Sequence, residues 1–437
     1  MRKSLRFVFF SWLGPLSLCG FLLAPGHSFA SQCSANLAWS AHANSSRASM
    51  DAFGLPNVDY SELDAALIGN LAQTPAEAYA HRLYIRLTGG PANPSQPRFR
   101  RVLKLVTEQK YFEAAAQVVE TENFLNVRTR NFAAPFTSKD GSPLEPFNDM
   151  QALMIGLVRD GLDARLLLTG NLRYSAYASF GLPAVSRANN DHYLKFDEKS
   201  LSLLTDLERV DKQWEDLNVG IGALTTRAWA KLQYEAGTNR RALRESFNLF
   251  LCAPIESWKM RGVPDSFVRR DVDRAPSGNP ANYQNTCRNC HALMDSMAGA
   301  FAHFDYVDNA LAYINSGVAA KYNQNGEVYP PGYVTSDSSW MNLLDYNTAV
   351  DFGWRTEKIG ESLPEFANML ANSSAFSRCM VKKVYTEVCG GTIAEHAPGL
   401  LDPMVKDLEA NGYNLKRLFT KTAAAPECIA HPAALSE

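Results

Sequence analysis

The chain has 437 residues, 46% of them hydrophobic and 11% aromatic, which is enough apolar material for a large folded core. The formal net charge is −2, and such a mildly acidic balance argues against nucleic acid as a partner. The composition is that of an ordinary globular protein.

Residues 1–30 predict a secretory signal peptide. Three basic residues lie among the first six positions, a largely apolar run follows over 7–23, and small residues precede a cleavage site expected after Ala30. An uncleaved membrane anchor is the alternative, which two prolines in and just after the run disfavour. Cleavage would change the net charge from −2 to −5. We expect a periplasmic or otherwise exported protein with no membrane span after cleavage.

A helical domain is expected over 61–245, after a leader or linker over 31–60 that is rich in Ser, Ala and Asn. Its first helix begins at Thr74-Pro75-Ala76-Glu77, which combines a capping threonine, a proline at the first helical position and a glutamate at the third. Gly89 and Gly90 would end this helix. Further helical patterns run over 98–127, 148–169 and 199–217.

Two segments of the chain resemble each other. Residues 150–169 (MQALMIGLVRDGLDARLLLT) and 401–420 (LDPMVKDLEANGYNLKRLFT) align without a gap. Each reads as a helix, a glycine that ends it (Gly161 or Gly412), and a second helix. An internal duplication would explain the similarity, and so would the general pattern of a helical hairpin.

The middle of the chain, over 246–345, has the composition of loops. Prolines, glycines and polar residues are frequent over 254–286 and again over 323–339. A helical pattern returns over 346–437. The predicted fold is therefore mainly α, with a helical N-terminal domain, a loop-rich central segment and a C-terminal helical domain.

The central segment contains the sequence TCRNCH. Cys287, Cys290 and His291 form the C-x-x-C-H pattern through which c-type haem is attached. Two cysteines on one helical turn can form thioethers with the porphyrin vinyl groups, and the histidine can bind the iron from the proximal side. Chance gives this pattern about 0.003 times in a chain of this composition. We expect one covalent haem c, anchored by Cys287 and Cys290, with His291 as proximal ligand.

Two other chemistries also use paired cysteines. A structural zinc site needs a second Cys or Cys/His pair with similar spacing, and the sequence has none. A thioredoxin-like dithiol needs a strand before the motif, whereas SGNPANYQNT precedes it here. Haem attachment is therefore the preferred interpretation.

The sequence around the motif resembles a known family. From 239–258 through 287–305 the chain is similar to exported monohaem proteins called planctomycete-type cytochromes, with shorter similarities at 82–90, 222–229 and 366–390. The matching positions are Leu251-Cys252, Cys287, Cys290, His291, Asp295 and Phe304-Asp305. Where that family often has proline and glycine, this chain has Ser296-Met297-Ala298-Gly299, so the turn after the proximal helix is expected to differ. The resemblance implies a haem protein with a co-exported protein partner.

The second axial ligand of the iron decides between electron transfer and ligand chemistry. Met294 and Met297 follow His291 too closely to reach the opposite face. Met341 lies 50 residues after His291, at the end of a loop, and is our first choice. The other candidates are Met369, Met380, His303 and His81.

The remaining cysteines suggest two disulfides. We expect Cys389 to pair with Cys428, joining two C-terminal helices, and Cys252 with Cys379, tying the central segment to that domain. Cys379 and Cys389 are not expected to pair with each other, since on one helix they would lie ~15 Å apart. Three loop arginines have two interpretations, as partners of haem propionates or, more simply, as solvated side chains. These are Arg269, Arg270 and Arg274.

Three functions are consistent with the sequence. Periplasmic electron transfer to a redox partner protein is favoured, because the chain has one haem motif, an export signal and no recognisable catalytic triad. A haem-dependent oxidoreductase with an open iron face is the second, and a haem-braced assembly or binding component the third. Whether the protein is an enzyme is left open by the sequence.

Overall fold

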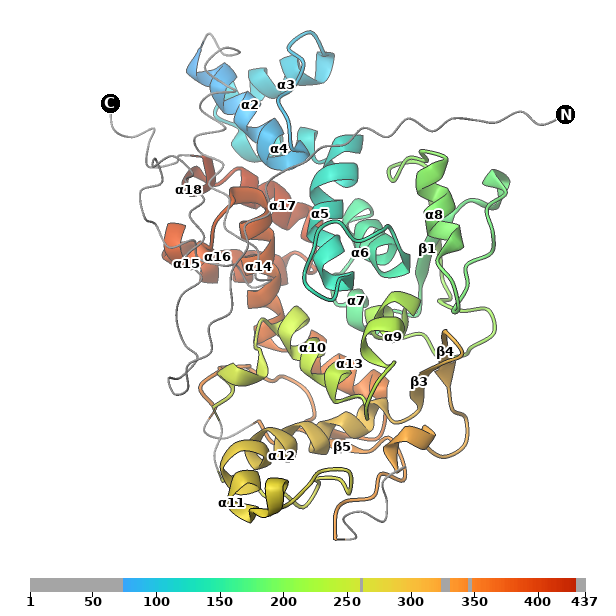
Figure 1. Ribbon diagram of the computed structural model, residues 1–437. Helices are drawn as coiled ribbons and strands as arrows, with labels where there is room; N and C mark the ends of the chain where they lie inside the picture. The colour runs from blue at the N-terminus through green and yellow to red at the C-terminus, as the bar shows by residue number, and fades with distance from the viewer. Residues whose placement is uncertain (1–73, 260–261, 324–330, 345–347, 430–437) are drawn as a thin grey trace, which may run out of the picture. The chain divides into compact units, whose positions relative to one another are not determined.

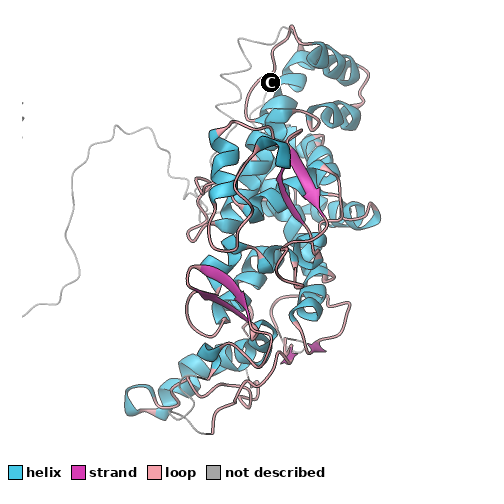
Figure 2. Cartoon of the chain, turned by 90° about the vertical axis from the view of Figure 1, so that its right-hand side faces the viewer, coloured by secondary structure: helices cyan, strands magenta, loops and turns pink. Residues whose placement is uncertain are grey.

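The computed structural model describes residues 74–259, 262–323, 331–344 and 348–429. The expected signal peptide, the cleavage site at Ala30 and the leader over 31–60 lie outside the described residues. The described residues belong to one compact unit and are mainly helical, as expected (Figure 1). Their strands form separate antiparallel pairs, with helical segments between them (Figure 2). None of the described helices has the length and apolarity needed to cross a membrane.

The first described helix is capped as its sequence predicts. The Thr74 side chain accepts a hydrogen bond from the Glu77 amide (3.2 Å), the Glu77 carboxylate accepts one from the Thr74 amide (3.1 Å), and Gly89 ends the helix with φ +75°. The N-terminal elements are α2 (Pro75–Thr88), α3 (Pro97–Thr107), α4 (Tyr111–Val118), α5 (Arg130–Ala133), α6 (Asp149–Arg159), α7 (Leu166–Thr169), β1 (Arg173–Ala176), α8 (Asp191–Glu198), β2 (Leu207–Val210) and α9 (Arg227–Gln233).

The prediction of a helix over 199–217 is wrong, because this range contains a strand. The chain leaves α8 at Glu198 and then forms β2, which pairs antiparallel with β1. Leu207 is buried, and its carbonyl accepts a hydrogen bond from Arg159 (2.6 Å). Pairing with a distant strand therefore overrides the local helical pattern.

The central segment is irregular but contains helices and short strands. α10 lies beside α13, and α12 packs against both α10 and β5 (Figure 1). The central elements are α10 (Arg240–Leu251), α11 (Pro280–Asn282), α12 (Arg288–Met297), β3 (Phe304–Val307), β4 (Ala310–Tyr313) and β5 (Trp340–Met341), which pairs with β6 (Ile359–Gly360).

The C-terminal helices contact the N-terminal ones. α17 packs on α2 and α4, and α14 packs on α2, α5 and α10. The C-terminal helices are α13 (Leu363–Ala371), α14 (Ser374–Cys389), α15 (Ile393–His396), α16 (Leu401–Ala410), α17 (Leu415–Ala423) and α18 (Pro426–Ile429).

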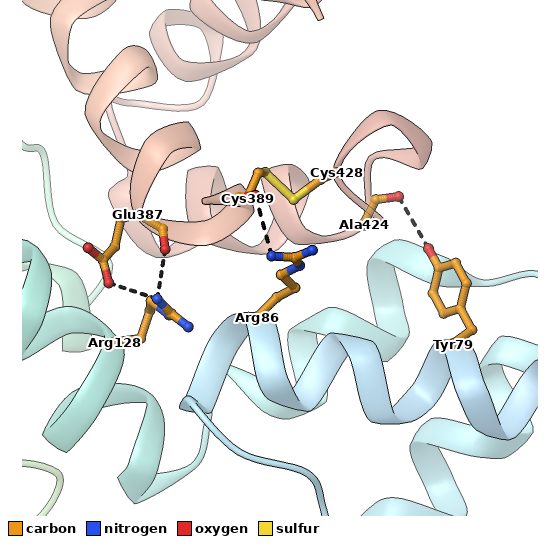
Figure 3. The surroundings of a disulfide bond; sticks show 7 residues. All are labelled: Tyr79, Arg86, Arg128, Glu387, Cys389, Ala424 and Cys428. Carbon is orange, nitrogen blue, oxygen red and sulfur yellow. Dashed lines mark hydrogen bonds and ion pairs between the residues drawn. A yellow bond between two sulfur atoms is a disulfide. The ribbon is translucent and has the colours of Figure 1, made fainter. Parts of the chain in front are cut away.

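Both expected disulfides are present. Cys389 of α14 is bonded to Cys428 of α18, and Cys252, at the end of α10, is bonded to Cys379 of α14. Around the first of these, Arg86 of α2 donates to the Cys389 carbonyl (3.3 Å) (Figure 3). The disulfides therefore tie α14 to both the chain end and the central segment.

The two similar segments share a helix that ends at a glycine, and they contact each other after it. In both, a glycine with positive φ follows the first helix (Gly161, +64°; Gly412, +69°). Asp163 and Asn414, which occupy equivalent positions in the alignment, form an antiparallel bridge. The two hairpins are therefore in contact at equivalent positions of the alignment.

Candidate haem attachment site

The motif lies on a continuous helical run. Asn279 accepts a hydrogen bond from the Ala281 amide (3.0 Å) and Pro280 occupies the first helical position, which together start α11. The run continues as a π-helical turn over Tyr283–Cys287 and then as α12. The buried Tyr283 anchors it, because its hydroxyl donates to Asp265 (2.9 Å). Residues three and four apart are neighbours on a helix, so Cys287, Cys290 and His291 share one side of this run.

The two motif cysteines differ from the other described cysteines in being free thiols. Cys287 is half-buried and Cys290 is exposed. Cys290 borders a cavity of about 330 Å³ whose apolar lining comes from Ile255, Trp258 and Leu293. Trp258 is fixed there, because it is buried and its indole N–H donates to the Ala253 carbonyl (2.9 Å).

The environment of Cys290 does not favour a redox dithiol. Desolvation raises the pKa of its thiol, and the Glu256 carboxylate and the Cys287 thiol raise it further. Reactive dithiols lie in surroundings that lower a cysteine pKa.

His291 has one buried and unpartnered nitrogen. The side chain is 25% exposed, yet Nδ1 is buried and has no hydrogen-bond partner. The exposure of the ring therefore comes from its other atoms. The nearest carboxylate oxygen to Nδ1 is Oδ1 of Asp295, one helical turn later, at 3.8 Å.

Asp295 is the centre of a buried charge network. Arg240 donates to both of its oxygens (Nη2 to Oδ2, 2.9 Å) and also forms a bidentate pair with Asp271 at 2.7 Å. The Arg269 amide donates to Asp295 Oδ2 (3.0 Å). Burial alone would raise the pKa of the Asp295 carboxyl, but the hydrogen bonds from Arg240 and the positive charges of Arg240 and Arg269 hold it well below its usual range. The carboxylate is therefore ionised.

The three loop arginines form hydrogen bonds within the protein, with Arg269 buried and Arg270 and Arg274 half-buried. Arg269 is buried, donates to Thr335 (2.7 Å) and stacks over Tyr322. Arg274 donates to the carbonyls of Val268 and Val272 (both 2.8 Å), and Arg270 donates to the Gly332 carbonyl (3.3 Å). They brace the loop before the motif.

Met341 lies on a strand that contacts α12, the helix of the motif. Met341 is half-buried on this strand, β5. The Ser339 carbonyl lies where a side chain at Gly299 would be, so the segment that leads into β5 passes directly over the turn that follows α12. Met341 as a distal ligand stays a prediction.

The other candidates for the distal ligand are buried in the core or hydrogen-bonded to neighbouring residues. The thioether of Met369 accepts a hydrogen bond from Asn342 (3.3 Å) inside the core, and Met380 is fully buried in α14. His81 of α2 is buried against Phe99 of α3, and His303 is hydrogen-bonded to the Ile314 carbonyl (3.0 Å).

Sequence reasoning missed the charge network and the cavity. The spacing of His291 and Asp295, four residues apart on one helix, was a usable signal for the first. Arg240 and Asp271 come from distant segments and Trp258 from a loop, so only the fold brings them to α12.

The residues present fit a covalently attached haem. Two free thiols and an imidazole share one side of a helix, the imidazole has a nitrogen facing a carboxylate, and an apolar cavity lies beside one thiol. Within the described ranges, no group of three or more His, Cys, Asp and Glu side chains is arranged to hold a metal ion by itself. No model of a protein family, no curated protein and no solved structure matches this chain.

Proposed function

We propose that this chain is an exported c-type monohaem protein that transfers electrons through one covalently attached haem. The observation that carries the proposal is the division of the cysteines. Of those described, four form two disulfides and the two that remain free are both members of the C-x-x-C-H motif. In an oxidising compartment thiols tend to be bonded to a partner, and haem attachment uses these two.

The chain's own residues have distinct parts in this proposal. Cys287 and Cys290 anchor the haem, and His291 is the axial ligand. Ile255, Trp258 and Leu293 would give the haem an apolar surface beside Cys290. The bound haem supplies one-electron chemistry, because its iron has two accessible oxidation states.

The partners follow from this chemistry and from the family resemblance. An electron carrier needs a donor and an acceptor, so a redox partner protein is expected. The similarity to planctomycete-type cytochromes adds a co-exported protein as a possible partner. Two disulfides are consistent with an oxidising compartment, which supports export.

The test is expression in a bacterial periplasm together with a cytochrome c maturation system. The purified full chain is expected to contain one haem that resists acid extraction, to give a pyridine haemochrome spectrum of a two-thioether haem, and to titrate in one reversible one-electron step. Cys287→Ser and Cys290→Ser should each shift the haemochrome band by removing one thioether. The double variant Cys252→Ser/Cys379→Ser is the control, because it also removes two cysteines and should keep the spectrum.

Other results would overturn the proposal. A chain without covalent haem, or with a disulfide between Cys287 and Cys290, would show that the motif serves another chemistry. A haem that is present but cannot be reduced reversibly would point to the bracing role. Rapid binding of carbon monoxide to the reduced protein would favour the oxidoreductase with an open iron face.

A further inference from the structure

One carboxylate is built into the fold next to the proximal histidine. The Asp295 side chain has no exposed area, and Arg240, Arg269 and His291 surround it. Hydrogen bonds from Arg240 and the Arg269 amide fix its position, so the carboxylate cannot turn away from His291 without breaking several bonds.

The geometry leaves one interaction incomplete. His291 Nδ1 is buried without a partner, and Asp295 Oδ1 lies 3.8 Å from it, which is beyond a hydrogen bond. A buried ring nitrogen without a partner is costly. A small rotation of the imidazole toward Asp295 would satisfy Nδ1 and leave Nε2 as the nitrogen available to a metal.

A histidine that binds a metal usually donates its other ring N–H to a second group, and a carboxylate in that position makes the ring a stronger donor. We propose that Asp295 is the positioning residue that accepts the His291 Nδ1–H hydrogen bond in the haem-loaded protein and thereby lowers the reduction potential. This inference rests on the proposed haem attachment.

Arg240 gives the arrangement a second property. It lies between Asp295 and Asp271 and pairs with both, so the Asp295 charge is shared between an arginine and the histidine. The pair with Asp271 restrains Arg240 and limits how much of the Asp295 charge it can neutralise. Asp295 thus remains a charged acceptor for His291 although it lies in the core.

The experiment compares Asp295→Asn with Asp271→Asn in the full, haem-loaded chain. Both substitutions keep the side-chain shape and remove one negative charge from the same network, but only Asp295 faces His291. The measurements are the reduction potential and the proton chemical shift of His291 Nδ1–H in reduced protein labelled with ¹⁵N-histidine. The wild type is expected to show a strongly hydrogen-bonded Nδ1–H signal.

Asp295→Asn is expected to raise the potential and to move the Nδ1–H signal toward that of a weaker hydrogen bond. Asp271→Asn should raise the potential less and leave the signal in place. Asp295→Glu restores the charge and should return the potential toward that of the wild type.

Equal shifts of the reduction potential in Asp295→Asn and Asp271→Asn, with an unmoved Nδ1–H signal, would overturn the inference. The proposed function would still stand if these proteins contained one haem per chain. A wild type without haem would instead overturn the proposed function. If Asp295→Asn does not fold, the Nδ1–H signal of the wild type still decides, because a weakly hydrogen-bonded position is incompatible with Asp295 as acceptor.

Discussion

At the scale of single residues, the haem proposal leads to a question about the methionines, namely which of them would reach the face of the iron opposite His291. Met341 lies on β5, a strand in contact with the proximal helix, and it is half-buried. Met294 is also half-buried, but it lies one turn from His291 on the same helix. A group on the proximal helix cannot bind the face opposite its own histidine.

Met341→Ala should therefore remove the sulfur-to-iron charge-transfer band of the oxidised protein. The reduction potential should fall, because a methionine ligand raises it, and reduced protein should bind carbon monoxide faster. Met294→Ala is the matched control and should keep the band. Retention of the band in Met341→Ala would exclude Met341 as the ligand.

At the scale of elements, the two helix–glycine–helix hairpins provide an internal comparison. Gly161 and Gly412 both have positive φ, where alanine costs about 1–2 kcal/mol. A Cβ at Gly161 would lie 3.0 Å from Nδ2 of Asn414, whereas a Cβ at Gly412 would meet no atom within 4 Å. Asn414 also caps α17 by accepting a hydrogen bond from the Arg417 amide (2.9 Å).

Gly161→Ala should consequently lower the free energy of unfolding more than Gly412→Ala, by about 1 kcal/mol, because it displaces the capping Asn414 side chain. Denaturant titrations of both variants measure the difference. Within Gly161→Ala, amide exchange should also rise at the start of α17. Equal losses in the two variants would mean that the hairpins do not contact each other in solution.

Local signals predicted several of these elements, and non-local contacts explain the failures. The Thr74 capping box and the Gly89 end of α2 depend on neighbouring residues, so the sequence was sufficient. Residues 199–217 have a helical pattern, but β2 forms there because β1 is available to pair with it. The thiols and imidazole of the site were predictable from one motif, whereas Arg240 and Asp271 reach Asp295 only through the fold.

At the scale of the whole molecule, polar contacts join the N-terminal helices to the C-terminal ones. Arg128 donates to the Glu387 carbonyl (2.7 Å) and to the Glu387 carboxylate (2.9 Å) (Figure 3). It also donates to the Ile85 carbonyl (3.0 Å). The Tyr79 hydroxyl of α2 also donates to the Ala424 carbonyl (3.4 Å). One guanidinium thus connects the end of α2 with the last turn of α14.

We expect Arg128→Ala to cost about 3 kcal/mol of unfolding free energy, because it leaves two carbonyls and a carboxylate without their charged donor. Amide exchange should increase both in the last turn of α2 and in the last turn of α14, two regions far apart in sequence. Denaturant unfolding and hydrogen exchange read by mass spectrometry measure the two effects.

Arg130→Ala is the matched control, since Arg130 lies two residues away and pairs with Asp197, but both side chains are about one-third exposed. Such a pair contributes about 1 kcal/mol or less, and its loss should affect exchange only around α8. If Arg128→Ala raised exchange near residue 128 alone, the N- and C-terminal helices would be independent in solution. Joint loss of protection would mean instead that these helices unfold as one cooperative unit. The Cys252–Cys379 disulfide also links α14 of that unit to the end of α10.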